Sequence, residues 1–216
     1  LNTTRQYIAM PLVLIGFSYL NRDRVKPFIG FVLLAMLFHT SAFFALLILF
    51  FYKRNISTSI AKILLILSFF IGITPLIPLV MNLFVGVFDM LGLDSFSFYI
   101  SETSEYNAEG LSLSRFLLTL YGFFLLLLLD GKSLYMRIFI VGIIMLNLFA
   151  FQPAIGRLAQ FFTCVQIVLI PNIPLYIKNK RNIIPLQLIS VVYMLVTFFF
   201  LLSGNIGGVV PYKFGF

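Results

Sequence analysis

Polar side chains that interrupt apolar stretches are the groups in this sequence that could do chemistry, and Arg157 is the foremost of them. It stands in the segment Gly156-Arg157-Leu158-Ala159-Gln160. Helical spacing places Gln160 on the face of Arg157, and the small neighbours allow another helix to approach. An Arg at the centre of a bilayer costs about 2.5 to 3.5 kcal/mol, so we expect Arg157 to be functional. The alternative is an Arg at a helix start whose long stem reaches the membrane surface.

His39 is a second candidate because it lies inside the apolar stretch 27–51. Burial of an imidazole in lipid removes its hydration and costs free energy, so a His without a role is unfavourable there, which favours a functional role for His39. The alternative is a buried neutral His bonded to a backbone carbonyl. Because His39 is the only His of the chain, it cannot belong to a set of His metal ligands.

Two further cations stand where an apolar run begins. Arg5, followed by Gln6, precedes the run that starts at Ile8, and it is either functional or a flank that reaches the membrane surface. Arg115 follows an acidic loop and opens an apolar helix. It is therefore either a site residue that faces outside or a partner for Glu109.

The longest polar segment, about residues 89–114, contains no Lys or Arg and holds most of the acidic residues. Glu102, Glu105 and Glu109 are three and four residues apart, so on a helical turn they would share one face. The loop is either a solvated surface or the source of a general base, for which Glu109 is the candidate.

Motifs for metal or nucleotide binding are missing from the sequence. Asp130-Gly131-Lys132-Ser133 ends like a phosphate-binding loop, but Leu126 stands where its first Gly is needed. Asp-x-Asp, His-Glu-x-x-His and Gly-x-Ser-x-Gly do not occur. The single cysteine, Cys164, excludes an intramolecular disulfide and a thiolate metal cluster. We therefore expect no metal and no cofactor.

Composition places these residues in a membrane protein. Residues of the set AVILMFWYC make up 61% of the chain and charged residues only 10%, whereas a soluble domain averages roughly 25% charged. The mean hydropathy is +1.08. The net charge of +8 is spread in short groups between apolar stretches, which is typical of membrane flanks and not of a nucleic-acid-binding face.

The apolar runs predict an all-α fold, a polytopic transmembrane bundle of about seven segments with kinked or re-entrant helices, since each crossing needs roughly 20 residues. We expect one membrane domain over 1–216, as a piece of a longer protein. Pro11, the Gly and Pro residues of the third segment and Pro153 after the fifth predict kinked or broken helices. The segments are approximately 6–20, 27–51, 60–88, 115–130, 137–151, 158–177 and 183–203.

Charge asymmetry predicts the orientation of these segments. The acidic loop would lie outside the cell and the groups Lys53-Arg54 and 178–181 inside. If the segments simply alternate in direction, Arg22 and Arg24 lie outside, although basic residues are usually found in cytoplasmic loops. Either 6–20 or 27–51 is re-entrant, or Arg22 and Arg24 are kept outside because they bind an anion.

An ordered series of short motifs adds a resemblance. Arg5-Gln6 leading to Ala9, Phe38-His39-x-Ser41-Ala42, the broken stretch from Thr74 to Pro78, and Arg157-Leu158-Ala159-Gln160-Phe161-Phe162 ending near Ile170-Pro171 make up the series. The series resembles the EpsG family of bacterial membrane proteins, which is linked to exopolysaccharide assembly and similar in role to O-antigen polymerases. The resemblance covers roughly residues 1–180, and members usually have additional helices ahead of the Arg-Gln element.

The resemblance implies a metal-independent glycosyltransferase of the bacterial cytoplasmic membrane that joins polyprenyl-diphosphate-linked sugars at the outer face. Arg157 and Arg5 would hold the diphosphate, and His39 or a loop carboxylate would act as the base. Gln6, Gln160, Arg115, Arg22 and Arg24 would contact substrate. The partners would be the polyprenyl-diphosphate-linked oligosaccharide, membrane lipid and other polysaccharide-assembly proteins, and no nucleic acid.

Two other classes of function remain open at this point. A transporter or flippase of lipid-linked saccharides would also need a cationic cavity and broken helices. A non-catalytic subunit of a polysaccharide assembly complex would need neither, and its Arg residues would only reach for the membrane surface.

Overall fold

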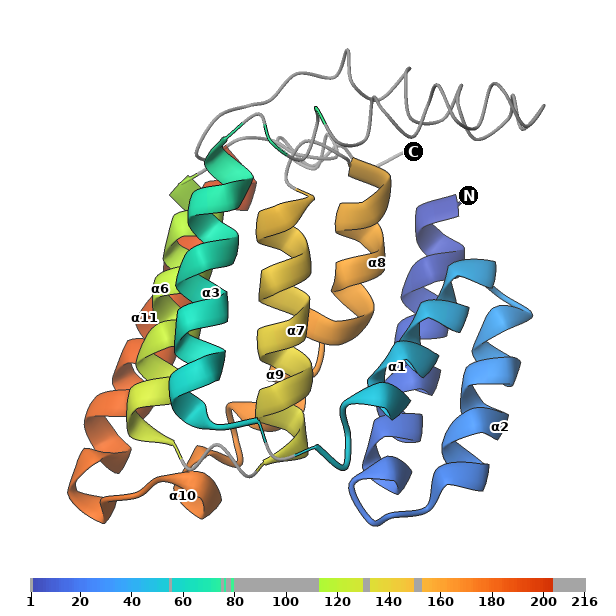
Figure 1. The fold of residues 1–216 in the computed structure, drawn as a ribbon, viewed down its shortest axis with the longest axis horizontal. Coiled ribbons are helices and arrows are strands. Elements are labelled where there is room, and N and C mark those ends of the chain that lie inside the picture. The colour runs from blue at the N-terminus through green and yellow to red at the C-terminus, as the bar shows by residue number, and fades with distance from the viewer. Residues whose placement is uncertain are drawn as a thin grey trace, which may run out of the picture.

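A computed structural model describes residues 2–54, 56–74, 113–129, 133–149 and 153–203, together with Leu76 and Leu79. This part is all-helical apart from one isolated bridge between Leu129 and Ile177 (Figure 1). One helix, over Lys180–Phe200, is long and apolar enough to cross a membrane, and shorter apolar helices of 10–17 residues accompany it. The elements are α1 (Asn2–Leu20), α2 (Val25–Met36), η1 (Thr40–Phe50), α3 (Thr58–Ile73), α6 (Leu113–Leu128), α7 (Leu134–Leu148), α8 (Pro153–Thr163), α9 (Gln166–Leu169), α10 (Ile173–Tyr176), η2 (Lys180–Asn182) and α11 (Ile183–Ser203).

Most of the apolar segments predicted from the sequence coincide with these helices, and the differences are local. α1 runs through Pro11 without a break, against the expectation for that proline. The segment expected over 158–177 is divided into α8, α9 and α10. The expected break around Pro153 agrees with α8, which begins at this proline, a residue well suited to the first turn of a helix. Most of 75–88 lies outside the described residues.

The apolar segment over 27–51, for which a re-entrant course was one of the expected alternatives, is not one continuous helix. α2 ends at Met36, His39 is extended with φ −150° and ψ 111°, and the 3₁₀ helix η1 follows from Thr40. The last turn tightens before the break, because the Phe38 and His39 N–H groups both donate to the Ala35 carbonyl at 3.0 Å. α2 and η1 pack against each other as a hairpin (Figure 1). His39 lies between the two helices, at the tip of this hairpin.

The residues of η1 explain why this segment is a 3₁₀ helix over 11 residues, a length that is uncommon for this conformation. Ala42, Ala45 and Ile48 are buried at intervals of three, and Phe43 and Phe44 between them are exposed. With 3.0 residues per turn, every third side chain lies on one straight face. This face packs against α2, α1 and α8, and its alanines allow a close approach.

The hairpin brings the basic groups of the chain to one end of the molecule, which we call the basic end. Because η1 returns along α2, Arg22 and Arg24 lie at the same end as Lys53 and Arg54 (Figure 1). Arg137 Nη1 donates to the Arg54 carbonyl at 2.8 Å, and Arg22 interacts electrostatically with Tyr135. The Lys178 N–H donates to the Leu128 carbonyl at 3.2 Å. The basic end comprises Arg22, Arg24, Lys26, Lys53, Arg54, Arg137, Lys178, Lys180 and Arg181.

Polar side chains join the helices of the larger group formed by α3, α6, α7 and α11. Asn147 of α7 accepts from the Thr119 hydroxyl at 3.0 Å and donates to the Ser68 hydroxyl at 3.2 Å, and all three side chains are buried. Between apolar helices, such bonds stabilise association without a hydrophobic driving force. The close approach of α3 to α7 requires a glycine at position 72, where a Cβ would collide with the Asn147 carbonyl.

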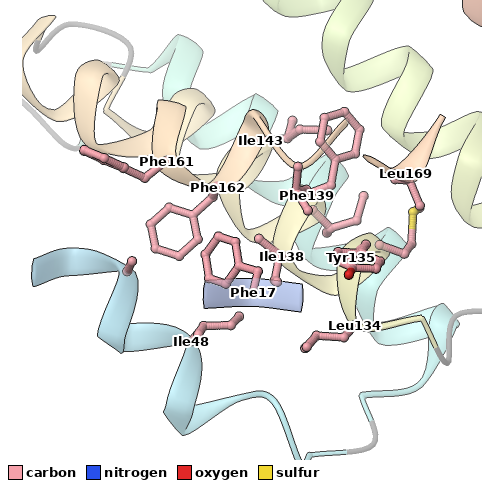
Figure 2. Close-up of a cluster of buried hydrophobic side chains, with 14 of the residues drawn as sticks. Phe17, Ile48, Leu134, Tyr135, Ile138, Phe139, Ile143, Phe161, Phe162 and Leu169 are labelled. Carbon is pink, nitrogen blue, oxygen red and sulfur yellow. The ribbon is translucent and has the colours of Figure 1, made fainter. Parts of the chain in front are cut away.

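The core joins the hairpin side of the molecule to this larger group through α8. Phe17 of α1 stacks on Phe28, with ring centroids 5.7 Å apart. The ring of Phe17 also lies 6.4 Å from the ring of Phe162 on α8 (Figure 2). α8 in turn packs closely on α7 at Gly142, where a Cβ would lie 2.9 Å from Phe162 Cβ. α8 is therefore held between α1 and α7, and its position sets the geometry of the residues it carries.

Candidate functional site

The candidate site is built where α1, α8 and the tip of the hairpin meet. The buried face of α1 consists of Ala9, Val13, Phe17 and Leu20, at the spacing of one side of an α-helix. Gln6 continues this face one turn earlier and is only 2% exposed. A buried amide among apolar side chains must be hydrogen-bonded, and α8 supplies its partners.

Gln6 donates twice to α8. Its Nε2 atom lies 2.7 Å from the Arg157 carbonyl oxygen and 3.2 Å from Gln160 Oε1. The amide thus connects α1 to the backbone of Arg157 and to the side chain one turn later. Since both N–H groups of the amide are used, α8 is held in position at the turn that carries Arg157.

Arg157 and His39 are brought together at this turn. The imidazole of His39 stacks on the ring of Phe161, with centroids 6.2 Å apart and an interplanar angle of 22°. The Arg157 charge acts electrostatically on the half-buried His39, whereas the Arg157 side chain itself is exposed. The site therefore joins a fixed imidazole to a guanidinium that is accessible from outside the bundle.

Ser41 adds a further polar group two residues beyond His39. Its hydroxyl is buried and has no hydrogen-bond partner among the described residues. An imidazole and a guanidinium both offer donors, so the arrangement suits an anionic ligand with several acceptor oxygens. In the part of the chain that the structure describes, no group of three His, Cys, Asp or Glu could hold a metal ion.

The structure places the other predicted site residues as follows. Arg5 is exposed on α1 next to Gln6. Arg115 lies half-buried in the first turn of α6, a helix that packs on α3, α7 and α11. Arg22 and Arg24 lie beyond the far end of α1, about 21 Å along the helix axis from Gln6. The structure does not bring them to Arg157, and Glu109 lies outside the described residues.

Sequence reasoning missed the part that Phe161 has in the site. Phe161 stood in a motif of the ordered series but was not considered as a site residue. Its contact with His39 depends on the break at His39, which brings the hairpin tip to α8. Gly or Pro, the usual signals of such a break, do not occur between Phe31 and Phe51.

The comparison with protein families agrees with the resemblance noted in the sequence. The model of the EpsG family matches residues 1–214, nearly the whole chain. No curated protein and no solved structure gives a match. The family and the apolar helices together suggest a membrane protein. Because the family match covers far more than half of its length, the chain belongs to the EpsG family.

Proposed function

We propose that this protein is a polysaccharide polymerase that transfers saccharides between polyprenyl-diphosphate carriers within the membrane. Membership of the EpsG family suggests a role in exopolysaccharide biosynthesis. The observation that carries the finer proposal is the stacking of His39 on Phe161 of α8, four residues after Arg157, at a turn that Gln6 holds from a third segment.

The depth of the site suits a substrate whose lipid tail stays in the bilayer. α2 has 12 residues, so it rises about 18 Å from the basic end, short of the roughly 30 Å of a hydrocarbon core. In our proposal the basic end faces the cytoplasm, as the excess of Lys and Arg there favours. His39 then lies about 12 Å below the outer boundary of the hydrocarbon, where the hairpin turns back.

The two side chains have complementary roles in the proposed transfer. The bond between the anomeric carbon of the donor sugar and the diphosphate oxygen breaks, and a new bond forms from that carbon to the acceptor hydroxyl oxygen. His39 accepts the proton of this hydroxyl. The diphosphate leaves as an anion, and Arg157 holds its oxygens through two parallel hydrogen bonds. Arg5 supplies a second guanidinium from the neighbouring turn of α1.

An assay in vesicles with the full-length protein tests the proposal. The vesicles contain a defined lipid-linked oligosaccharide on the side of the acceptor, and both the length of the product and the leaflet of the donor lipid are measured. Growth of the saccharide supports the polymerase. Movement of the donor lipid without growth of the saccharide would show that the protein is a flippase instead. If neither growth nor movement were observed, the protein would be a non-catalytic subunit of an assembly complex.

Variants connect the activity to the site. Arg157→Ala should shorten or abolish the polymer at a normal protein level, because the leaving diphosphate loses its partner. Arg181→Ala removes an equally exposed cation from the basic end and should leave polymer length unchanged. Unchanged polymer in Arg157→Ala would remove this residue from the mechanism.

A further inference from the structure

A cavity that opens at the basic end differs in character from the Arg157 site. It measures about 240 Å³ and is lined mainly by α3 and α7, with Leu126 of α6 and with Phe51, which follows η1. Its lining is apolar except at one end, where Arg137 of the first turn of α7 borders it together with Thr58. The residues that line the cavity include Phe51, Leu64, Ile140, Ile144, Met145 and Arg137.

The polar end of this cavity is cationic. Arg137 Nη1 donates to the backbone carbonyl of Arg54 at 2.8 Å, which holds the backbone of Arg54 at this mouth. Lys53 stands beside them, with its Nζ atom 5.5 Å from the centre of the Tyr52 ring. α3 and α7 both begin at this end, so their N-termini add partial positive charge. The only Asp or Glu among the described residues is Asp23.

The shape of the cavity suits a hydrocarbon chain that runs along α7. From Arg137 to Met145 it extends eight residues, or about 12 Å along the helix axis. Its volume is a little below the roughly 300 Å³ at which small-molecule pockets begin, so it accepts part of one chain and not a compact polar molecule. An apolar cavity with the side chain of Arg137 at its mouth and Arg54 beside it has the two features of a phospholipid site.

We propose that this cavity binds one anionic phospholipid of the leaflet next to the basic end. One acyl chain lies between α3 and α7, and the phosphate contacts the guanidinium groups of Arg54 and Arg137. A neutral lipid would leave the cationic mouth without a counter-charge, which selects an anionic headgroup. The inference does not depend on the proposed polymerase activity, because the cationic mouth lies at the start of α7, whereas the turn of α8 that carries Arg157 lies near the end of α7.

The absence of tryptophan from the chain makes a direct test possible. Phe51→Trp places the one tryptophan of this chain in the wall of the cavity. The full-length protein is reconstituted into vesicles with a brominated phosphatidylglycerol or a brominated phosphatidylcholine, and bromine quenching reports contact of each lipid with the indole. We expect about fivefold or greater preference for the anionic lipid, the effect of roughly one cation near a membrane surface.

Phe124→Trp is the matched control. Phe124 and Phe51 are both 38% exposed, and Phe124 lines an apolar groove between α6 and α11 that has no cation among its lining residues. Quenching there should be equal for the two lipids. Equal quenching at Phe51→Trp as well would overturn the proposal.

Charge variants identify the headgroup contact. In the Phe51→Trp background, Arg54→Gln with Arg137→Gln should abolish the preference, whereas Lys180→Gln with Arg181→Gln should keep it. A preference that survives loss of Arg54 and Arg137 would show a general surface effect and refute the site. Displacement of the brominated lipid by an equal amount of polyprenyl phosphate would also overturn the proposal, since the cavity would then bind the polyprenyl carrier of the saccharide and not a phospholipid.

Discussion

Replacing Gly72 by Ala should destabilise the protein although alanine is the better helix former. A Cβ at position 72 would lie 2.8 Å from the Asn147 carbonyl carbon and closer still to its oxygen. Because carbon atoms pack at about 3.5 to 4.0 Å, α3 and α7 would have to separate by at least about 0.7 Å. Backbone atoms cannot move aside as a flexible side chain can, so overpacking costs about 3 kcal/mol.

The same separation weakens the buried bond from Asn147 to Ser68, which is 3.2 Å long, by about 0.6 kcal/mol. The greater helix propensity of alanine returns about 1 kcal/mol. We therefore expect a net loss of about 2 to 3 kcal/mol in the free energy of unfolding. Gly30→Ala is the control, because no atom lies within 4 Å of the added Cβ, and it should gain up to about 1 kcal/mol.

The free energy of unfolding of both variants can be measured for the full-length protein in mixed micelles, by titration with a denaturing detergent and circular dichroism. The reasoning predicts shifts of opposite sign. If Gly72→Ala were as stable as Gly30→Ala, the close contact between α3 and α7 would be refuted.

Three further predictions concern the polar and aromatic contacts. Gln6→Leu should lose the two hydrogen bonds to α8 and about 1 kcal/mol of stability, measured by the same unfolding titration. Gln6→Glu should be no more stable than Gln6→Leu, because a carboxylate cannot donate either bond. Asn147→Leu should cost about 1 to 3 kcal/mol because two buried hydroxyls lose their partner; a smaller loss than for Ser18→Ala would argue against the network. Phe161→Leu should lower polymer yield through a misplaced His39 while stability falls by only about 1 kcal/mol, and an unchanged yield would exclude this contact from the mechanism.

The apolar runs of the sequence were sufficient to predict where the long helices of the bundle lie. The segments expected over 115–130 and 183–203 differ from α6 and α11 by about two residues or less, which is the usual uncertainty of helix ends. A long apolar stretch has few alternatives to a helix, because its backbone groups must be satisfied within the segment.

The break at His39 could not be predicted in the same way. Met36-Leu37-Phe38-His39-Thr40 contains neither Gly nor Pro, and the helix ends there because η1 packs back against α2, α1 and α8. The interval of three between Ala42, Ala45 and Ile48 is visible in the sequence, but an α-helical interpretation fits the same apolar residues. The hairpin also removes the conflict with charge asymmetry, because it brings Arg22 and Arg24 to the side of Arg54.

The candidate site shows the same division between what a sequence contains and what only the structure reveals. Arg157 and His39 were recognisable because charged or titratable side chains are costly in apolar surroundings. Their proximity was not, since it depends on how α8 is fixed between α1 and α7. The bond from Gln6 to the Arg157 carbonyl leaves no trace in the sequence, because every residue has a backbone carbonyl.

Binding of a lipid-linked diphosphate to the full-length protein is the most direct test of the site. The dissociation constants of polyprenyl diphosphate-oligosaccharide are measured in nanodiscs for the wild type, Arg157→Gln and Arg181→Gln. A bidentate guanidinium contact predicts that Arg157→Gln weakens binding about tenfold or more, since charged hydrogen bonds contribute about 1.5 to 3 kcal/mol, while Arg181→Gln binds as the wild type. Equal affinity of all three proteins would contradict the placement of the diphosphate beside His39 and Arg157.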